Sequence, residues 1–305
     1  MKTKQNGIAL ITAMLVSALA TLVATNLAWD NSLDVRRTIV NLGRDQAIQI
    51  ALGAESWVSI MLKEDLQNSQ RDHLDEIWAG QLPGLPIEGG EVYGLVEDLQ
   101  GKFNVNSLIK DDGEVNEVAL NQFRRLLEAL NVDPKFAGLI ADWIDPDSDA
   151  LFPDGAEDSI YTAIIPPYRT ANQKLTSVSE ITAVEGMNRQ IWKIVEPHIT
   201  ALPTSEGINV NTATPAVLMS LNDSMLESDV ERLLTERTGG GFSDIQSTFT
   251  PLVPADILMT LKESSEFFRL KVVVRLDTVR ITLFSLLHRD RTGTVTTILR
   301  SYGTV

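Results

Sequence analysis

The chain has 305 residues, a formal net charge of −15 and no cysteine. The acidic balance argues against a broad nucleic-acid-binding surface, which needs clustered Lys and Arg, and it favours basic partners or divalent cations. The absence of cysteine excludes disulfides, zinc thiolate sites and thiol catalysis. The length is sufficient for two globular domains beside a long helix.

An uncharged run from Ile8 to Trp29 follows Lys2 and Lys4. A helix rises about 1.5 Å per residue, so this run is long enough to cross a bilayer's hydrocarbon core. The lysines place Met1 in the cytoplasm and everything after the run on the other side of the membrane. We therefore predict a single transmembrane segment over residues 8–29, in a single-pass protein.

The helical pattern continues beyond that segment, because no proline precedes Pro83 and apolar residues recur every seven positions. The repeating positions are Val40, Ala47, Ala54 and Met61, with Leu33, Ala51 and Val58 in the same stripe. The pattern predicts one continuous helix that ends near Asn68, half in lipid and half packed under a soluble domain.

A short basic leader that ends in Gly7 and precedes an apolar helix resembles a type IV prepilin signal. The resemblance implies that a prepilin peptidase cuts between Gly7 and Ile8, removes residues 1–7 and usually methylates the new N-terminus. Thr12 stands where most pilins carry Glu, and Ile8 where Phe is commoner. In pilins that Glu is thought to neutralise the N-terminal amine of the neighbouring subunit above. An unpaired carboxylate in lipid is costly, so Thr12 favours a subunit with nothing above it, at a filament tip.

Two other interpretations of the N-terminus stay open. An ordinary secretory signal would be cut after Ala20, and a plain membrane anchor would not be cut at all. The mass of the mature N-terminal peptide distinguishes the three cases, which begin at Ile8, Thr21 or Met1.

Strand patterns occur near both ends of the soluble part. Residues 82–86 read as a loop, and residues 91–106 as a hairpin with a turn around 98–101. Alternating apolar and charged residues over 268–276, followed by runs at 279–287 and 294–300, predict an antiparallel meander of three strands.

The long middle of the chain has helical spacing over 114–131, 134–144, 177–199 and 214–238. Ser177 and Glu180 form a capping box at one of the helix starts. Strands, a helical block and again strands predict an α+β protein with a helical domain inserted into a sheet domain. A long helix on an antiparallel sheet is the pilin fold. We assign residues 30–106 and 263–305 to the pilin-like domain and 107–262 to the inserted domain.

Within the inserted domain, the segment from about 205 to 250 resembles a helix-hairpin-helix unit of DNA-binding competence proteins. Those units hold a phosphate on the amides of a Gly-rich hairpin. Here the hairpin reads Asn222-Asp223-Ser224-Met225, with no glycine and an added acid. We therefore expect the unit to serve packing and expect no nucleic-acid partner.

The highest density of carboxylate side chains occurs in an acidic stretch from Asp142 to Asp158. Crowded carboxylates repel one another unless a cation joins them, and oxygen ligands on Pro- and Gly-containing bends suit calcium. Ala150 and Ala156 stand where an EF-hand loop needs Gly and Glu, so this is not an EF-hand. The predicted calcium ligands are Asp145, Asp147, Asp149, Glu157 and Asp158.

Two further interpretations of the acidic stretch stay open: a pair of catalytic carboxylates, and a solvated loop that holds no ion. Asp142 lies one helical turn before Asp145 and is expected to cap or form an ion pair rather than bind metal. Asn172 and Glu180 are candidates to close the site from the next segment. No P-loop, Gly-x-Ser-x-Gly or His-Glu-x-x-His motif is present in the sequence. We therefore predict no catalytic residues and no enzyme activity.

The whole chain resembles the general secretion pathway protein K family, minor pseudopilins of bacterial type II secretion. The resemblance rests on the Gly7/Ile8 junction with Thr12, the segments Gly101–Asn106 and Asp142–Asp147, Gly155–Asp158, Tyr168–Asn172 and Ser179–Ile181. It implies a calcium-containing helical domain inserted in a pilin fold and a tip complex with minor pseudopilins I, J and H above the major pseudopilin G. The soluble domain would lie in the periplasm, anchored in the inner membrane, and would initiate the pseudopilus for protein export. The alternative is a membrane-anchored periplasmic calcium-binding interaction protein that does not polymerise.

Overall fold

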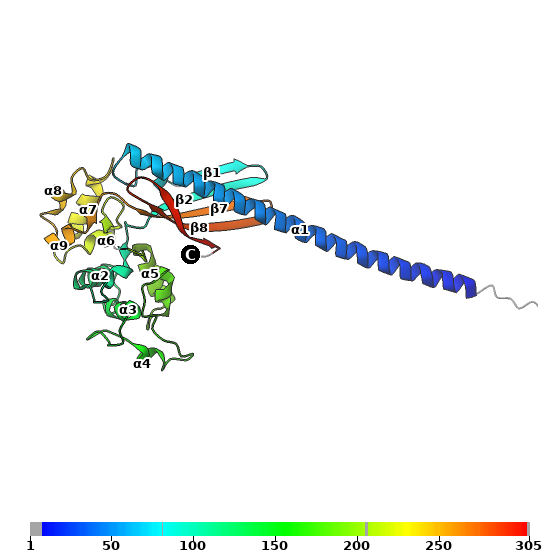
Figure 1. Ribbon diagram of the computed structural model, residues 1–305, viewed down its shortest axis with the longest axis horizontal. Coiled ribbons are helices and arrows are strands. Elements are labelled where there is room, and N and C mark those ends of the chain that lie inside the picture. Colours follow the sequence, from blue (N-terminus) through cyan, green and yellow to red (C-terminus); the bar gives the residue numbers. More distant parts are fainter. Residues whose placement is uncertain (1–7, 81, 205–206, 304–305) are drawn as a thin grey trace, which may run out of the picture.

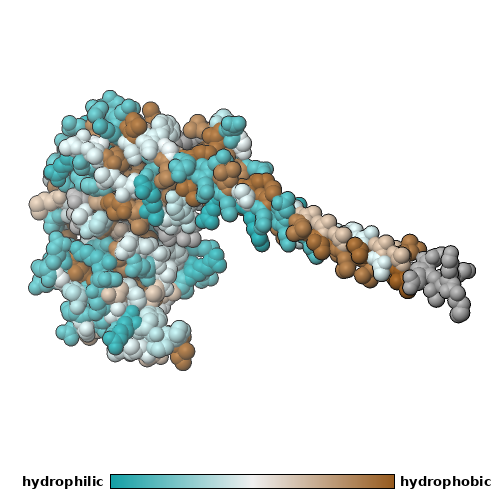
Figure 2. All heavy atoms as spheres, turned by 45° about the vertical axis from the view of Figure 1, so that its right-hand side comes forward, coloured by the Kyte–Doolittle hydropathy of each residue, from teal (hydrophilic) through white to brown (hydrophobic). Residues whose placement is uncertain are grey.

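A computed structural model describes residues 8–80, 82–204 and 207–303. Its first element, α1 (Ile8–Asn68), is one continuous helix, which confirms the predicted length. The N-terminal half projects away from the rest of the molecule (Figure 1), and apolar side chains cover it (Figure 2). By length and hydropathy, α1 is the one helix in the described chain able to cross a membrane. Gly7, the predicted cleavage position, lies outside the described residues.

The C-terminal half of α1 packs on a five-stranded antiparallel sheet with the strand order β1-β2-β7-β8-β9 (Figure 1). The strands are β1 (Leu82–Ile87), β2 (Gly90–Asp98), β7 (Phe267–Leu276), β8 (Val279–Arg289) and β9 (Val295–Tyr302). The predicted C-terminal meander is confirmed, although the observed strand limits differ from the predicted ones by one or two residues.

The predicted hairpin over 91–106 is wrong. Its first strand, β2, pairs with β1, which occupies the segment predicted as a loop. Pro86 lies in β1, but β1 is an edge strand, where proline removes no hydrogen bond that the sheet needs. After Asp98 the chain leaves the sheet, and the short β3 (Phe103–Asn104) pairs in parallel with β4 (Ile199–Thr200).

Small residues on α1 allow the helix to lie close to the sheet. Ala47 and Ala51 are fully buried, as are Val58 and Leu62 farther along the same face. They pack against a sheet face of Val92, Val96, Phe268, Leu270, Val272, Val274, Leu283 and Leu287. The predicted stripe is therefore confirmed in its C-terminal part, whereas Val40 is 51% exposed because the helix has already left the sheet there.

A mainly helical block lies between β2 and β7 and has its own apolar core, which includes the stacked rings of Phe103 and Phe123. Its helices are η2 (Val105–Leu108), α2 (Glu117–Ala129), α3 (Phe136–Ile144), α4 (Asp158–Tyr161), η3 (Val178–Ala183), α5 (Arg189–Val195), η4 (Glu196–His198), α6 (Pro215–Met219), α7 (Glu227–Glu236), α8 (Ile245–Phe249) and α9 (Ala255–Leu258). A second short parallel pair joins β5 (Ile208–Asn209) and β6 (Leu261–Lys262). The fold is thus α+β, a pilin fold with an inserted helical domain at the end of the sheet away from the projecting helix (Figure 1). The exact limits 107 and 262 stay a prediction.

Candidate metal centre

Two loops of the inserted domain carry the predicted metal site. Residues 145–158, the acidic loop, follow α3 and lead into α4, and residues 162–172, the return loop, come back from α4. Carboxylate oxygens of Asp145, Asp147 and Glu157 all lie within 4.8 Å of one another. Asp145 and Glu157 are buried and Asp147 is exposed, so the cluster has a buried base and a side open to solvent.

Asp142 shapes the acidic loop from below. Its carboxylate is fully buried and accepts hydrogen bonds from the backbone N–H of Leu151, at 3.0 Å, and of Ala156. The chain passes so close at Gly155 that a Cβ there would lie 2.2 Å from Asp142 Oδ2. Asp142 therefore caps backbone amides, as expected, and leaves the metal-binding geometry to its neighbours.

The cluster contains buried oxygens that have no hydrogen-bond donor. They are Asp145 Oδ1, Glu157 Oε1 and Asn172 Oδ1, three of the five buried unpartnered side-chain atoms in the described chain. Burying an acceptor without a donor is costly. Burial and the nearby Asp142, Asp147 and Glu157 raise the pKa of Asp145 to about 7. Burial likewise raises the pKa of Glu157. The oxygens and the unbalanced negative charge both fit a hard cation.

Asn172 joins the site from the return loop. Its amide Nδ2 donates to the backbone oxygen of Asp147 at 2.8 Å, and its backbone N–H donates to that of Trp143 at 3.1 Å. Its φ of 46° is left-handed, a conformation that Asn tolerates better than most residues. Glu180, the other candidate, instead binds the backbone N–H groups of Thr176 and Ser177 and completes the predicted capping box.

The structure places the other two predicted ligands outside this group of three. Asp149 is exposed, and its backbone N–H donates to Asp147 Oδ1 at 2.8 Å. Asp158 begins α4, and its Oδ1 accepts from both the N–H and the hydroxyl of Thr170 at 3.1 Å. Its other oxygen lies 3.7 Å from Arg169. Asp158 thus fastens the return loop to the acidic loop.

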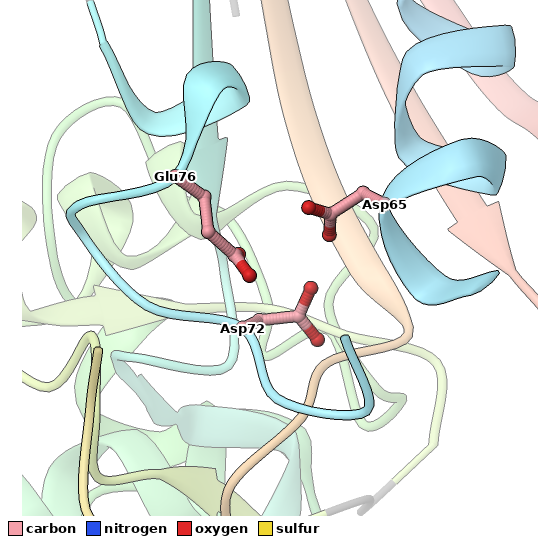
Figure 3. Close-up of side chains that lie close together, drawn as sticks. All are labelled: Asp65, Asp72 and Glu76. Carbon is pink, nitrogen blue, oxygen red and sulfur yellow. The ribbon is translucent and has the colours of Figure 1, made fainter. Parts of the chain in front are cut away.

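A second group of carboxylates, which the sequence analysis missed, lies where α1 ends. Asp65, Asp72 and Glu76 point toward one another (Figure 3) and lie within 4.8 Å. Here a cation is supplied by the protein, because Arg289 Nη2 donates to both oxygens of Asp72, at 2.7 and 2.5 Å. Arg289 is 1% exposed and also binds the backbone oxygen of Leu62 at 3.0 Å. This group joins the helix end to β8, and no local sequence pattern signals it.

The antiparallel sheet, the inserted helical domain with an oxygen-rich centre, and one long helix that is apolar enough to cross a membrane define a pilin-like protein. Two family models, both described as type II secretion system (T2SS), protein K, match residues 101–204 and 208–252. Type II secretion system protein K of Aeromonas hydrophila is 30% identical over 98% of both chains. The Pseudomonas aeruginosa protein of the same name is 32% identical over 99% of this chain and 94% of its own. The chain belongs to the type II secretion system protein K family, structural minor pseudopilins rather than known enzymes.

A solved structure supports the same fold. In the crystal structure of the GspK-GspI-GspJ complex from the enterotoxigenic Escherichia coli type 2 secretion system, one chain matches with a TM-score of 0.78 and 26% sequence identity. The match covers 88% of this chain and 100% of that chain. The inserted domain is therefore part of the shared fold and not an addition peculiar to this sequence.

Proposed function

We propose that this chain begins the pseudopilus of type II secretion, as the minor pseudopilin at its tip. It would assemble with minor pseudopilins I, J and H above the major pseudopilin G and so drive protein export across the outer membrane. The observation that carries the proposal is the likeness, over the whole of the solved chain, to a protein crystallised with GspI and GspJ. The apolar half of α1 would lie in the inner membrane and the soluble domain in the periplasm.

The position of the inserted domain supports the tip assignment. It lies at the end of the sheet opposite the projecting half of α1 (Figure 1), where a further subunit would have to stack. The side chain of Thr12 agrees with this position, since its hydroxyl is bonded within its own helix to the backbone oxygens of Ile8 and Ala9, at 3.1 and 3.0 Å. It needs no amine from a subunit above.

Processing by prepilin peptidase between Gly7 and Ile8, with methylation of Ile8, is part of the proposal. Mass spectrometry of the N-terminal peptide should find a chain that begins at Ile8. A native protein that still begins at Met1 would refute the proposal.

Disulfide crosslinking tests the assembly directly, because the chain has no cysteine of its own. A cysteine in place of Leu19, in the apolar half of α1, should crosslink to a cysteine at the matching depth in minor pseudopilin I. A cysteine in place of Met259, which is 77% exposed on the inserted domain, is the control and should not. If the Leu19 variant crosslinks to no other pseudopilin, the chain is a membrane-anchored binding protein that does not polymerise.

We also propose that the candidate metal centre holds calcium. Asp145, Asp147 and Glu157 would supply carboxylate oxygens and Asn172 its amide oxygen, a donor set that suits calcium. Bound calcium would supply the positive charge that offsets the crowded carboxylates and would join the acidic loop to the return loop. Binding to the folded state alone would stabilise the inserted domain.

Calorimetric titration of the purified protein with calcium, together with thermal unfolding with and without EGTA, tests the metal proposal. Asp145→Asn should weaken calcium binding by more than about tenfold. Asp133→Asn removes a half-exposed acid of the same domain and should bind calcium as the wild type does. Asp149→Asn and Asp158→Asn decide whether the two other predicted ligands contribute. Unchanged unfolding in EGTA would refute calcium binding.

A further inference from the structure

The two most exposed large apolar side chains in the described chain belong to the loops of the candidate metal centre. Phe152, in the acidic loop, is 92% exposed, and Ile165, in the return loop, is 93% exposed. Even the apolar membrane half of α1 has lower values, with Trp29 at 67%. Single exposed apolar residues need no explanation. Here, however, the two highest exposed fractions occur on the two loops of the same candidate site, which indicates a shared role.

These side chains stand at one end of the inserted domain. Ile160, on α4 between the two loops, is 40% exposed. In Figure 1, α4 forms the lowest part of the molecule, and Figure 2 shows a small apolar patch at the same height among mostly polar side chains. We call Phe152, Ile160 and Ile165, together with exposed Asp147 and Asp149, the acidic–apolar surface.

The surface rests on a packed base. The hydroxyl of Thr170 donates to Glu157 at 3.2 Å and ties the return loop to the acidic loop. Beneath them, the rings of Trp143 and Tyr161 meet edge to face at 5.1 Å, and Tyr168 packs on Tyr161 at 5.4 Å. These contacts hold the backbone of the two loops, while Phe152 and Ile165 themselves remain almost fully exposed.

The charge around these side chains selects the kind of partner. Residues 142–158 contain seven carboxylates, and no Lys, Arg or His occurs between Asp142 and Arg169. One divalent cation would therefore leave the loop strongly negative. Such a surface repels anionic lipid headgroups and attracts a protein surface rich in Lys and Arg.

We propose that the acidic–apolar surface is a docking site for a periplasmic protein partner that presents an apolar socket ringed by Lys and Arg. Phe152 and Ile165 would enter the socket, and Asp147 and Asp149 would face its basic rim. Cation binding at Asp145 and Glu157 would hold the two loops in register, so docking depends on the cation. This last step rests on the calcium centre proposed above.

Photo-crosslinking in the full-length, membrane-embedded protein tests the proposal. Ile160 is replaced by the photoreactive amino acid p-benzoylphenylalanine, with Met259 as the control position on the same domain. Crosslinks are then compared in the presence of calcium and of EGTA. We expect one crosslinked protein from position 160 and not from 259, with Lys and Arg beside apolar residues in the crosslinked peptide. Added salt should lower its yield.

The substitutions Phe152→Ser and Ile165→Ser together should reduce that crosslink by at least about tenfold, as expected for buried anchors of an interface. Calcium titration of the same double variant should match the wild type, which shows that the loops are still folded. Crosslinks to phospholipid instead of protein, an acidic crosslinked peptide, or full yield from the double variant would overturn the docking site. Equal yield in calcium and EGTA would overturn its dependence on the cation, whereas the titration alone judges the metal centre.

Discussion

Glu55 of α1 and Arg300 of β9 form an ion pair of 2.7 Å beside the apolar contact between the helix and the sheet. The Glu55 side chain is 6% exposed and also accepts hydrogen bonds from the hydroxyls of Ser285 and Thr297. Burial works against its ionisation, but the bonds from Arg300, Ser285 and Thr297 outweigh burial and hold its pKa below the ordinary value of 4.5. This contact fixes the rotation and axial position of α1 against β8 and β9.

Glu55→Ala should lower the free energy of unfolding by about 3 kcal/mol, because it leaves buried donors without an acceptor. Glu64→Ala, at an exposed position of the same helix, should change it by less than about 0.5 kcal/mol. Because the folded pKa of Glu55 is lowered, its stabilisation is present above about pH 4.5 and is lost as the pH falls through the folded pKa. Urea unfolding of the detergent-solubilised protein gives both quantities. Equal losses for the two variants would contradict the assigned role.

For the three clustered carboxylates at the end of α1 (Asp65, Asp72 and Glu76), we expect stability to depend on pH in the opposite direction. Burial, with Glu76 and Asp72 nearby, raises the pKa of Asp65 to about 7, although Arg289 partly offsets the shift. The ionised form is therefore disfavoured in the folded state, and stability falls as the pH rises from the unfolded pKa near 3.8 toward 7. The three carboxylates titrate as a coupled group.

Asp65→Asn removes that ionisation and should stabilise the protein more at about pH 8 than at about pH 5, by about 1–2 kcal/mol. Arg289 interacts more strongly with the ionised Asp65, and the raised pKa already includes this interaction. The difference between the two pH values therefore measures the net cost of ionising Asp65 in the folded state. Urea unfolding at the two pH values measures it, and Asp45→Asn, an exposed position on α1, is the control. An effect that does not change with pH would show that Asp65 is ionised throughout.

Most of the fold could be predicted from local sequence patterns. The long helix and the C-terminal meander follow from periods of seven and two residues that packing on one face preserves. Strand β1 was missed because Pro86 reads as a loop residue unless the strand is known to lie at an edge. Glu55 interrupts an apolar stripe, and its partner Arg300 is 245 positions away, a pairing that no single sequence reveals.

The candidate metal centre was predictable in composition but not in geometry. Asp145 and Asp147 follow from their spacing, and Glu157 from the second acidic run. The start of α4 decides that Asp158 faces Thr170, which spacing cannot show. The left-handed backbone at Asn172 likewise decides that its amide reaches Asp147.

Asn209 joins the inserted domain to the pilin sheet. Its side chain is fully buried, and Nδ2 donates to Asp98 Oδ2 and Ser265 Oγ at 2.9 Å and to the backbone oxygen of Asp72 at 3.1 Å. Asn209→Ala should therefore cost about 3 kcal/mol. Asn121→Ala, at an exposed position on α2, should cost less than about 0.5 kcal/mol.

The pH dependence of the Asn209→Ala cost offers a second check on this junction. Burial raises the pKa of Asp98 to about 6, and losing a donor should raise it further, so the cost should be larger at about pH 8 than at about pH 5. Urea unfolding at both pH values measures it. A cost no greater than that of Asn121→Ala would mean that Asn209 does not hold the two parts together.

Gly155 offers a way to disturb the candidate metal centre without changing any carboxylate. A Cβ at this position would lie 2.2 Å from Asp142 Oδ2 and 2.3 Å from the backbone N of Leu151, so Gly155→Ala must push the acidic loop away from its base. If the loop positions calcium ligands, the variant should bind calcium at least about tenfold more weakly and unfold at a lower temperature.

Gly53→Ala is the control, because a Cβ there meets no atom within 4 Å and alanine in a helix interior should stabilise by about 0.5–1 kcal/mol. Calorimetric titration and thermal unfolding compare the two variants. Calcium binding by Gly155→Ala equal to the wild type would show that the loop geometry does not determine the site.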